Sequence, residues 1–415
     1  MNILYLSLAP HMGLGDPLGY GTHMREVAAA LEEAGHAVVR YIAGSGGLVP
    51  ATGGGPAAAG RTAPPDATGA HAPRRPRLAA HVPPPVRHLA RDLRELWHDR
   101  RAAGPLARLI TAARIEAVYE RSAFMQLAGL ELARARGLPH LLEVNAPIEE
   151  RRDHHGYPLY RVGRARERRK LALADQVVCV TSALRDYLAE AGADPARIHV
   201  IPNAVRPAAF VLDPEARAKL RARLGVGPDQ VGVGFVGRFG FWRGMHALMA
   251  AVAAVAAATP HAHFVLIGDG QLMPDVRRFI GERNLGSRVT LTGGLPPAAV
   301  PAHVAALDVG VLAGSPWYSS PIKLFEYGAA GLAVVAPRVP AVEEVLADGS
   351  EGILVAPEDA PALAAAVLSL VADESRRRAL GERYRARVCA EFTWARVASR
   401  VTDLLLSSPR RGGRS

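Results

Sequence analysis

The 415-residue chain is poor in cysteine, lysine and aromatic residues, and the shortage of cysteine excludes some classes of protein. Its two cysteines, Cys179 and Cys389, lie far apart, which excludes a disulfide framework and a cysteine metal site and suits a reducing compartment. No apolar run approaches the ~18–20 residues of a membrane-spanning helix. The first residues, MNILYLSLAP, lack a basic leader and read directly as a strand. We therefore expect a cytoplasmic, soluble protein.

The net charge of +11 comes almost entirely from arginine and is unevenly distributed. Residues 86–101 form an arginine-rich amphipathic helix candidate, and residues 161–170 contain six basic residues and one acid. These segments are either solvated helix faces or a means of attracting anions, such as a phosphorylated small molecule or an acidic membrane surface. Nucleic acid is not expected as a partner, because no zinc module, RNP-type motif or convincing helix-turn-helix pattern is present.

Apolar strands alternate with helical patterns along the chain, which predicts two α/β units with parallel sheets covered on both faces. The first unit spans 1–205 and is interrupted at 44–85 by a low-complexity stretch of Gly, Ala and Pro, which we predict to be a mobile loop. The second unit spans 206–388, and a last helix capped by Thr393 and a basic tail make up 389–415. Other expected helices cover 22–35, with Thr22 as N-cap, and, as two separate helices, 86–102 and 104–113.

The loop after the first strand, LAPHMGLGDPLGYGTHMRE, is rich in glycine but matches no dinucleotide fingerprint. The pattern G-x-G-x-x-G fails in both registers, and the P-loop lysine is missing. What remains is a glycine-rich approach to a helix N-terminus at Gly19 and Gly21, where backbone N–H groups and the helix dipole favour an anion. A plain flexible loop explains the same residues.

In the second unit, the sequence VGRFGFWRG places Arg238 and Arg243 just after an apolar strand. Two guanidinium groups at the carboxyl edge of a strand can clamp diphosphate oxygens, although ordinary surface arginines also occur there. Because ligands of open α/β sheets bind at this edge, we interpret the pair as a diphosphate site.

The stretch YSSPIKLFEYGAAGLAVVA, residues 318–336, opens a helix after Ser319 and Ser320. Lys323 lies in its first turn and adds positive charge to an anion-binding N-terminus. Glu326 follows about one turn later, where a carboxylate could accept two hydrogen bonds from a vicinal diol such as that of a ribose. Diphosphate and ribose sites together indicate a nucleotide-sugar ligand, although a solvated helix residue would also explain Glu326.

Several of these stretches resemble the retaining glycosyltransferases of family 4, which have the GT-B fold. GRFGFWRG is similar to the diphosphate motif of that family, and SSPIKLFEYGAAGLAVVA to its nucleotide-binding helix. VIPNAV resembles the hinge between the two domains, and EFTW the start of a terminal helix that crosses back to the first domain. The resemblance covers nearly the whole chain outside 44–85. It implies α/β architecture with two Rossmann-like, doubly wound parallel-sheet domains facing across a cleft, an acceptor domain first and a nucleotide-sugar domain second.

The resemblance also implies a role for individual residues. Arg238 and Arg243 would hold the donor diphosphate, and Asn145 would contact the donor sugar. The donor-binding set would comprise Gly19, Gly21, Gly237, Gly268, Gly270, Leu295, Ser319, Ser320, Ile322, Lys323 and Glu326. The acceptor would meet residues at strand ends near the cleft, for which Glu120, Arg121 and Glu143 are the candidates.

Three departures from the family pattern bear on mechanism. Arg243 stands where the family usually has Lys, Tyr318 where it often has an acid that orients the sugar, and Asn145 where it often has His. An asparagine can form hydrogen bonds but cannot act as a base, which favours front-face retention, in which the leaving phosphate takes the acceptor proton. No metal or other cofactor is expected, since no Asp-x-Asp occurs in the chain.

The sequence therefore predicts a retaining glycosyltransferase that moves a sugar from a nucleotide sugar, such as a UDP- or GDP-sugar, to an acceptor hydroxyl. The acceptor would be a natural product, a polysaccharide or a lipid-linked glycan, the last with peripheral contact to an anionic membrane. A GT-B sugar-nucleotide epimerase, a phosphorylase and a non-catalytic scaffold on a membrane surface are the alternatives.

Overall fold

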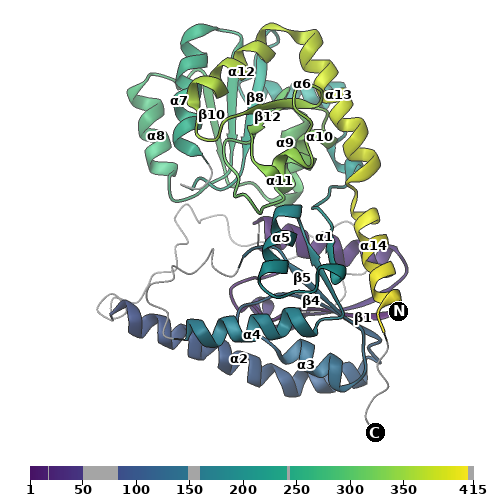
Figure 1. Ribbon diagram of the computed structural model, residues 1–415. Coiled ribbons are helices and arrows are strands. Elements are labelled where there is room, and N and C mark those ends of the chain that lie inside the picture. The colour runs from purple at the N-terminus through teal and green to yellow at the C-terminus, as the bar shows by residue number, and fades with distance from the viewer. Residues whose placement is uncertain (17, 50–82, 148–158, 241–243, 410–415) are drawn as a thin grey trace, which may run out of the picture.

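The protein is described here by a computed structural model that places all residues except 17, 50–82, 148–158, 241–243 and 410–415. Two domains, each built around its own sheet, lie one above the other, with the first domain below in Figure 1. Each sheet is covered by helices, as expected when nearly every strand is apolar on both faces.

The first domain holds a seven-stranded sheet in the order β3-β2-β1-β4-β5-β6-β7. All neighbouring strands are parallel except β3, which runs antiparallel to β2. The strands are β1 (Asn2–Ser7), β2 (Ala37–Ile42), β3 (Gly47–Val49), β4 (Ala117–Arg121), β5 (His140–Val144), β6 (Gln176–Cys179) and β7 (Ile198–Val200). The helices are α1 (Gly19–Glu33), α2 (Pro84–Ala112), α3 (Ala128–Ala135), α4 (Tyr160–Leu173) and α5 (Ser182–Glu190).

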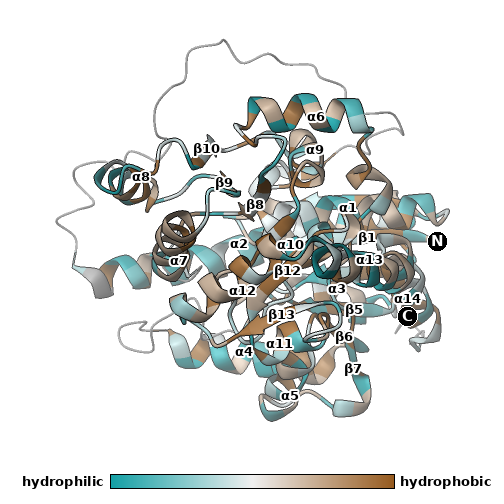
Figure 2. Ribbon diagram, turned by 90° about the horizontal axis from the view of Figure 1, so that it is seen from above, coloured by the Kyte–Doolittle hydropathy of each residue, from teal (hydrophilic) through white to brown (hydrophobic). Residues whose placement is uncertain are grey.

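The second domain holds a six-stranded parallel sheet in the order β10-β9-β8-β11-β12-β13. Its strands are β8 (Val231–Val236), β9 (Ala262–Ile267), β10 (Val289–Gly293), β11 (Val309–Val311), β12 (Ala333–Pro337) and β13 (Gly352–Val355). Its helices are α6 (Pro214–Arg223), α7 (Met245–Ala258), α8 (Met273–Glu282), α9 (Val300–Ala305), α10 (Ile322–Ala329), α11 (Pro340–Glu343), α12 (Ala360–Ala372) and α13 (Glu374–Glu391). In Figure 2 the brown, apolar colour lies on strands such as β12 and β13, while outer helices such as α13 are largely teal.

The strand order places one topological switch point in each sheet. It lies between β1 and β4 in the first sheet and between β8 and β11 in the second, where the chain moves from one side of the starting strand to the other. Ligands of open α/β sheets bind outside the carboxyl ends of the strands at such points. The loops after β1, β4, β8 and β11 are therefore the first places to look for a site.

The last helix of the chain, α14 (Trp394–Ser407), belongs to the core of the first domain. Thr393 caps it, its Oγ1 accepting the Arg396 N–H at 3.4 Å. The buried side chains of Trp394 and Val401 pack in the same apolar cluster as residues of β1 and α1. Figure 1 shows the chain passing from α13 on the upper domain directly into α14 on the lower one.

Three sequence expectations about elements were wrong. Helix α1 begins at Gly19 and not after Thr22, because the Leu18 carbonyl already accepts the Thr22 N–H at 3.1 Å. The expected helices at 86–102 and 104–113 form one helix, α2, with Pro105 inside it. Ala102, Leu106 and other residues on both sides of this proline pack into one apolar cluster, which holds the two halves in line.

The third difference lies in the stretch at 44–85. Its beginning is ordered, because Gly47–Val49 forms β3 and pairs with β2. Most of the expected mobile loop, 50–82, lies outside the described residues.

Candidate active site

The part of the candidate site that was predicted to bind the nucleotide begins at the carboxyl end of β8. A side chain at Gly237 would place its Cβ 2.7 Å from Lys323 Cε, so the lysine of α10 lies directly over the backbone of this loop. Gly268, after β9, has a φ of +136°, and a Cβ there would lie 1.8 Å from the Gly237 carbonyl oxygen. Only glycine fits such a position. The loops after β8 and β9 therefore touch through their backbones, and Gly270 makes a similar close approach to Phe239.

Arg238 follows Gly237 and is exposed to solvent. The structure thus brings the cations of Arg238 and Lys323 to the same edge of the second sheet. The expected partner in the diphosphate clamp, Arg243, lies outside the described residues, so its placement stays a prediction. Leu295, after β10, is half-buried against the apolar cluster that underlies α10.

Helix α10 starts at the boundary between the domains. Its N-cap residue is Pro321, and no side chain caps it. Ser320 just before it is buried, and its Oγ accepts the Asn203 backbone N–H at 3.1 Å. The Ser320 carbonyl accepts the Asn203 side-chain amide at 2.5 Å. Ser320 therefore ties α10 to the segment that joins the two domains, while Ser319 and Ile322 beside it remain half-buried.

Glu326, in the second turn of α10, lies where the domains meet. Burial raises the pKa of its carboxyl above the ordinary 4.5, the nearby Lys323 lowers it, and Glu26 of helix α1 raises it further. The side chain still retains partial access to solvent. A carboxylate that faces a neighbouring domain and a lysine, yet stays accessible, can accept hydrogen bonds from ligand hydroxyls.

The first domain contributes a carboxylate, Glu143, surrounded by donors. Tyr119 donates its hydroxyl at 2.5 Å and Arg121 its guanidinium at 2.6 Å, and the Asn145 amide also donates to Glu143. His23 Nε2 lies 3.0 Å from Glu143 Oε1. Burial alone would raise the pKa of Glu143, but the charges of His23 and Arg121 and the hydrogen bonds outweigh burial and hold it well below its usual range.

This environment limits what Glu143 can do chemically. A carboxylate that already accepts three hydrogen bonds and an ion pair is a weak base and a poor nucleophile. Arg121 and Glu143 lie side by side because they pair in the register of β4 and β5, and both side chains are buried. Their role in acceptor binding stays a prediction.

Glu120 lies apart from this group. As the neighbour of Tyr119 and Arg121 on a strand, it points to the opposite face of the sheet. There it is fully buried, next to the backbone of Gly129 in α3, and His140 Nε2 lies 2.9 Å from its carboxylate. The structure therefore does not bring Glu120 together with the other candidate acceptor residues, and the pattern of strand ends alone could not distinguish the two faces.

The glycine-rich loop after β1 is held by its own side chains. Asp16 accepts the Gly13 N–H at 2.8 Å and the Tyr20 hydroxyl at 2.6 Å, and Arg25 donates to the Asp16 carbonyl at 2.9 Å. A Cβ at Gly21 would lie 2.2 Å from that same carbonyl, so glycine is required there. Gly19 has open space around it. Closure of this loop over a phosphate stays a prediction.

The described residues contain no group of three or more His, Cys, Asp and Glu side chains placed to hold a metal ion. In the part of the chain that the structure covers, no helix is both long and apolar enough to cross a bilayer.

Comparison with known proteins identifies this arrangement. Residues 18–209 match the family model described as Glycosyltransferase Family 4, and residues 230–373 match the model described as Glycosyl transferases group 1. The chain is 30% identical over 353 residues to an alpha-maltose-1-phosphate synthase of Mycolicibacterium smegmatis, covering 80% of this chain and 88% of that protein. The chain belongs to glycosyltransferase family 4.

A second relative, also from Mycolicibacterium smegmatis, is named a GDP-mannose-dependent alpha-(1-6)-phosphatidylinositol monomannoside mannosyltransferase. It is 30% identical over 265 residues, which cover 62% of this chain and 69% of the relative. The crystal structure of HepE from Anabaena in complex with UDP has the same fold, with a TM-score of 0.70 at 17% identity, covering 98% of this chain and all of that one. The expected GT-B architecture is confirmed. The protein is thus a glycosyltransferase of the hexosyltransferase type with a nucleotide-sugar donor.

Tyr318, which replaces the frequent acid of the glycosyltransferase family, takes part in the contact between the domains. It is buried in an apolar cluster of first-domain residues, and its carbonyl accepts the Thr181 hydroxyl at 3.1 Å. Next to it, Trp317 is half-exposed and stands edge-on to Tyr187 of α5, with ring centres 6.1 Å apart. A tyrosine at this position therefore fixes the loop before α10 against the first domain.

Two residues that link the domains of this glycosyltransferase were not predicted from the sequence. His23 and Asn203 contact each other at 2.6 Å, although they are 180 positions apart in the chain. The motif VIPNAV indicated a hinge, but neither residue belongs to a pattern with a chemical meaning of its own. A histidine on the buried face of α1 is as easily a core residue, and only the folded chain shows its partners.

Proposed function

We propose that this enzyme transfers a hexosyl group from a nucleoside-diphosphate hexose to an acceptor hydroxyl with retention of configuration and without a metal ion. The observation that carries the proposal is the placement of Lys323 over Gly237, next to Arg238, with Glu326 one turn along α10. In the proposal, the cations hold the diphosphate at the switch point of the second sheet and Glu326 accepts the ribose hydroxyls. The match of residues 230–373, a range that includes all of these residues, with the family model described as Glycosyl transferases group 1 supports this assignment.

In the proposed reaction, the bond between the anomeric carbon and the diphosphate oxygen breaks, and the acceptor oxygen bonds to the same face of that carbon. The acceptor proton passes to the departing phosphate. The protein contributes charge and geometry, since preorganised cations stabilise the leaving diphosphate as its charge develops. The surroundings of Glu143 support this mechanism, because a carboxylate with a strongly lowered pKa is unsuited to act as base or nucleophile.

The donor can be tested by thermal unfolding with UDP, GDP, ADP and dTDP, before and after addition of EDTA. GDP and GDP-mannose come first, because the mannosyltransferase relative is named as GDP-mannose-dependent. We expect one nucleotide to raise the unfolding temperature in EDTA and to lose most of this effect in Glu326→Ala. The exposed Glu282→Ala in α8 is the matched control and should behave as the wild type. A folded protein that no nucleotide stabilises would contradict the donor site.

Product analysis separates the proposal from its alternatives. A transferase releases a nucleoside diphosphate and an α- or β-glycoside whose configuration is read by NMR, and retention is expected. An epimerised nucleotide sugar without glycoside would indicate an epimerase, and a sugar phosphate formed from inorganic phosphate would indicate a phosphorylase.

We also infer that the first domain rests on an anionic membrane through helix α2. Val86, Leu93 and Trp97 are each about half-exposed, and their spacing of seven and four residues places them along one side of the helix. The Arg101 guanidinium lies 4.7 Å above the Trp97 ring, and Arg100 is exposed beside it. Exposed tryptophan and leucine flanked by arginine are typical of helices that lie in a bilayer interface.

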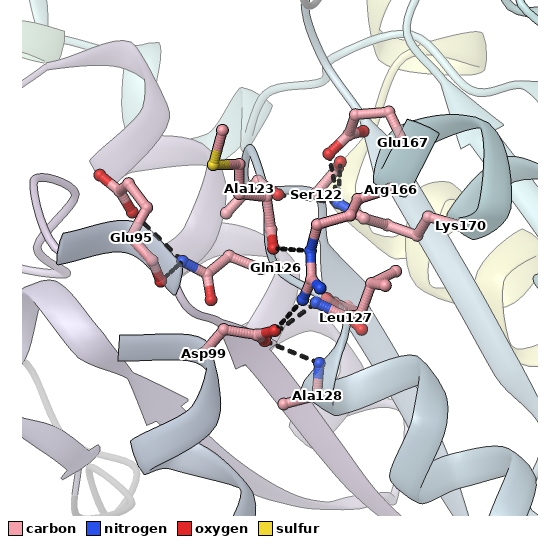
Figure 3. Close-up of polar contacts among 12 residues, drawn as sticks. Glu95, Asp99, Ser122, Ala123, Gln126, Leu127, Ala128, Arg166, Glu167 and Lys170 are labelled. Atoms are coloured by element: carbon pink, nitrogen blue, oxygen red, sulfur yellow. Dashed lines mark hydrogen bonds and ion pairs between the residues drawn. The ribbon is translucent and has the colours of Figure 1, made fainter. Parts of the chain in front are cut away.

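Only part of the basic segment at 161–170 is exposed to solvent. Figure 3 shows that Arg166 and Lys170 of α4 point inward, toward α2 and the segment after β4. Arg166 pairs with Asp99 and donates to the Met125 carbonyl at 2.6 Å, while Lys170 is fully buried and donates to Glu167 at 2.9 Å. The remaining exposed basic side chains of α4 are Arg161, Arg168 and Arg169.

Vesicle pelleting tests this membrane contact. The wild type should pellet with vesicles containing phosphatidylglycerol and stay in solution with phosphatidylcholine alone, and the double variant Leu93→Ser, Trp97→Ser should lose binding. The control variant Leu406→Ser removes a still more exposed apolar side chain on α14 and should pellet as the wild type does. Equal pelleting of all three proteins, or of none, would contradict the inference.

A further inference from the structure

His23 lies in α1 between two oxygen atoms that belong to different parts of the molecule. Its side chain is buried, with Nδ1 2.6 Å from Asn203 Oδ1 and Nε2 3.0 Å from Glu143 Oε1. The ring also stands edge-on against Trp394 at the start of α14, at a centroid distance of 5.4 Å. Residues from α1, β5, α14 and the segment joining the domains thus meet at one imidazole.

The orientation of the Asn203 amide follows from its other contact. A carbonyl oxygen accepts hydrogen bonds and cannot donate them. Because the Ser320 carbonyl lies 2.5 Å from the Asn203 side chain, the amide nitrogen must point toward Ser320. The amide oxygen, Oδ1, must then point toward His23, where it can only accept a hydrogen bond.

The second neighbour of His23 is also an acceptor. Glu143 receives hydrogen bonds from Tyr119, Arg121 and Asn145, which is the pattern of an ionised carboxylate. A neutral imidazole has an N–H on one nitrogen and a lone pair on the other, so it would place that lone pair against one of the two oxygens. An imidazolium ring presents an N–H to Asn203 Oδ1 and brings its positive charge against the Glu143 carboxylate, with which Nε2 forms an ion pair without an aligned hydrogen bond.

The other groups around His23 are fixed in their charge. From β4, the Arg121 cation and the neutral Tyr119 hydroxyl face Glu143, and from β1 the Tyr5 hydroxyl lies near the same carboxylate. Burial and the Glu143 charge raise the pKa of both tyrosine hydroxyls. Trp394 carries no charge, and the other acid of α1 on this side, Glu26, pairs with Arg206. Among these described groups, His23 is therefore the one whose protonation has to be inferred from its contacts.

We propose that His23 is a positioning residue, protonated on both ring nitrogens, that holds the sugar end of the donor site to its nucleotide end across the two domains. On one side it fixes Glu143, which orients Asn145. On the other it fixes Asn203, which holds Ser320 and so the start of α10 with Lys323 and Glu326. The catalytic consequence rests on the proposed function, whereas the protonation and the link between the domains do not.

NMR of the histidine rings tests the link without any substrate. In the nucleotide-free protein at neutral pH, the His23 ring, assigned by its absence in His23→Gln, should show both nitrogens protonated. His199 serves as an internal comparison, because burial lowers its pKa and it contacts the Gln176 side chain at 2.7 Å. We expect it to be neutral under the same conditions. A neutral His23 tautomer at this pH would overturn the proposal.

Kinetics then tests positioning. In His23→Gln, kcat should be about tenfold lower, as expected for a small misplacement of reacting groups, while KM for the donor changes little. His199→Gln should keep the wild-type kcat and KM. A His23→Gln enzyme with wild-type kcat would overturn the positioning role.

The variant Asn203→Asp tests the contact with Ser320 separately from the protonation of His23. The new carboxylate still accepts from His23, so the ring should stay protonated by NMR, but it no longer donates to the Ser320 carbonyl. We expect kcat to fall about as much as in His23→Gln, that is roughly tenfold, and wild-type kcat would contradict the link to α10. If no donor at all is transferred, the proposed function fails, and the NMR result alone decides the protonation and the contact between domains.

Discussion

In the proposed donor site, Glu326 would couple nucleotide binding to pH at the scale of a single residue. Its pKa is raised above 4.5, first by burial and further by Glu26, while Lys323 works against the rise. Only the ionised carboxylate can accept from both ribose hydroxyls. We therefore expect nucleotide affinity, measured by calorimetry, to weaken as pH falls through this raised pKa. Glu326→Gln should bind about tenfold more weakly at neutral pH and without this pH dependence, and a pH-dependent variant would contradict the assignment.

The raised pKa of Glu326 also affects stability, and in the opposite direction: affinity for nucleotide should rise with pH, whereas the free energy of unfolding should fall. Without nucleotide, the folded chain holds a proton on Glu326 over a pH range in which the unfolded chain has lost it. The free energy of unfolding should therefore decrease as pH rises from the ordinary pKa of the carboxyl to its raised value. Urea denaturation at several pH values should show a smaller decrease in Glu326→Gln than in the wild type. An unchanged slope would mean that another group is responsible.

At the scale of elements, the contact between the loops after β8 and β9 depends on glycine. Gly268→Ala would place a methyl group against the Gly237 carbonyl in a backbone conformation that alanine rarely adopts. We expect a loss of about 1–3 kcal/mol in the free energy of unfolding together with weaker nucleotide binding. Gly281→Ala is the matched control: it lies in helix α8 with no atom within 4 Å of its Cβ. It should stabilise the protein by about 0.5–1 kcal/mol and leave binding unchanged.

The elements also show what the sequence could and could not predict. Strands such as β8 were predictable because continuous apolar runs of that length require burial on both faces. The start of α1 and the continuity of α2 through Pro105 were not predictable, because both depend on packing against distant segments. In the candidate site, Lys323 and Glu326 were found by their spacing along one helix. His23 and Asn203 were not, because their partners are distant in the chain.

For the molecule as a whole, the relative position of the domains depends on contacts such as that of Glu344 with α5. Glu344 follows α11 of the second domain, and its carboxylate accepts the Ser182 N–H, at the start of α5, at 3.0 Å. An acid at a helix N-terminus is stabilising, so Glu344→Ala should cost about 1 kcal/mol of stability. Hydrogen exchange should accelerate in the first turn of α5. The neighbouring Glu343→Ala, which lacks this contact, should leave that exchange unchanged, and equal effects would contradict the prediction.

Helix α14 has a consequence for how this protein is made. The core of the first domain contains Trp394 and Val401, which leave the ribosome only after the whole second domain has been synthesised. The first domain therefore cannot complete its core during translation in the usual order, N-terminal part first. Until α14 docks, the apolar faces of α1 and β5 that it covers are open to water, and a nascent chain in that state offers a binding surface to chaperones.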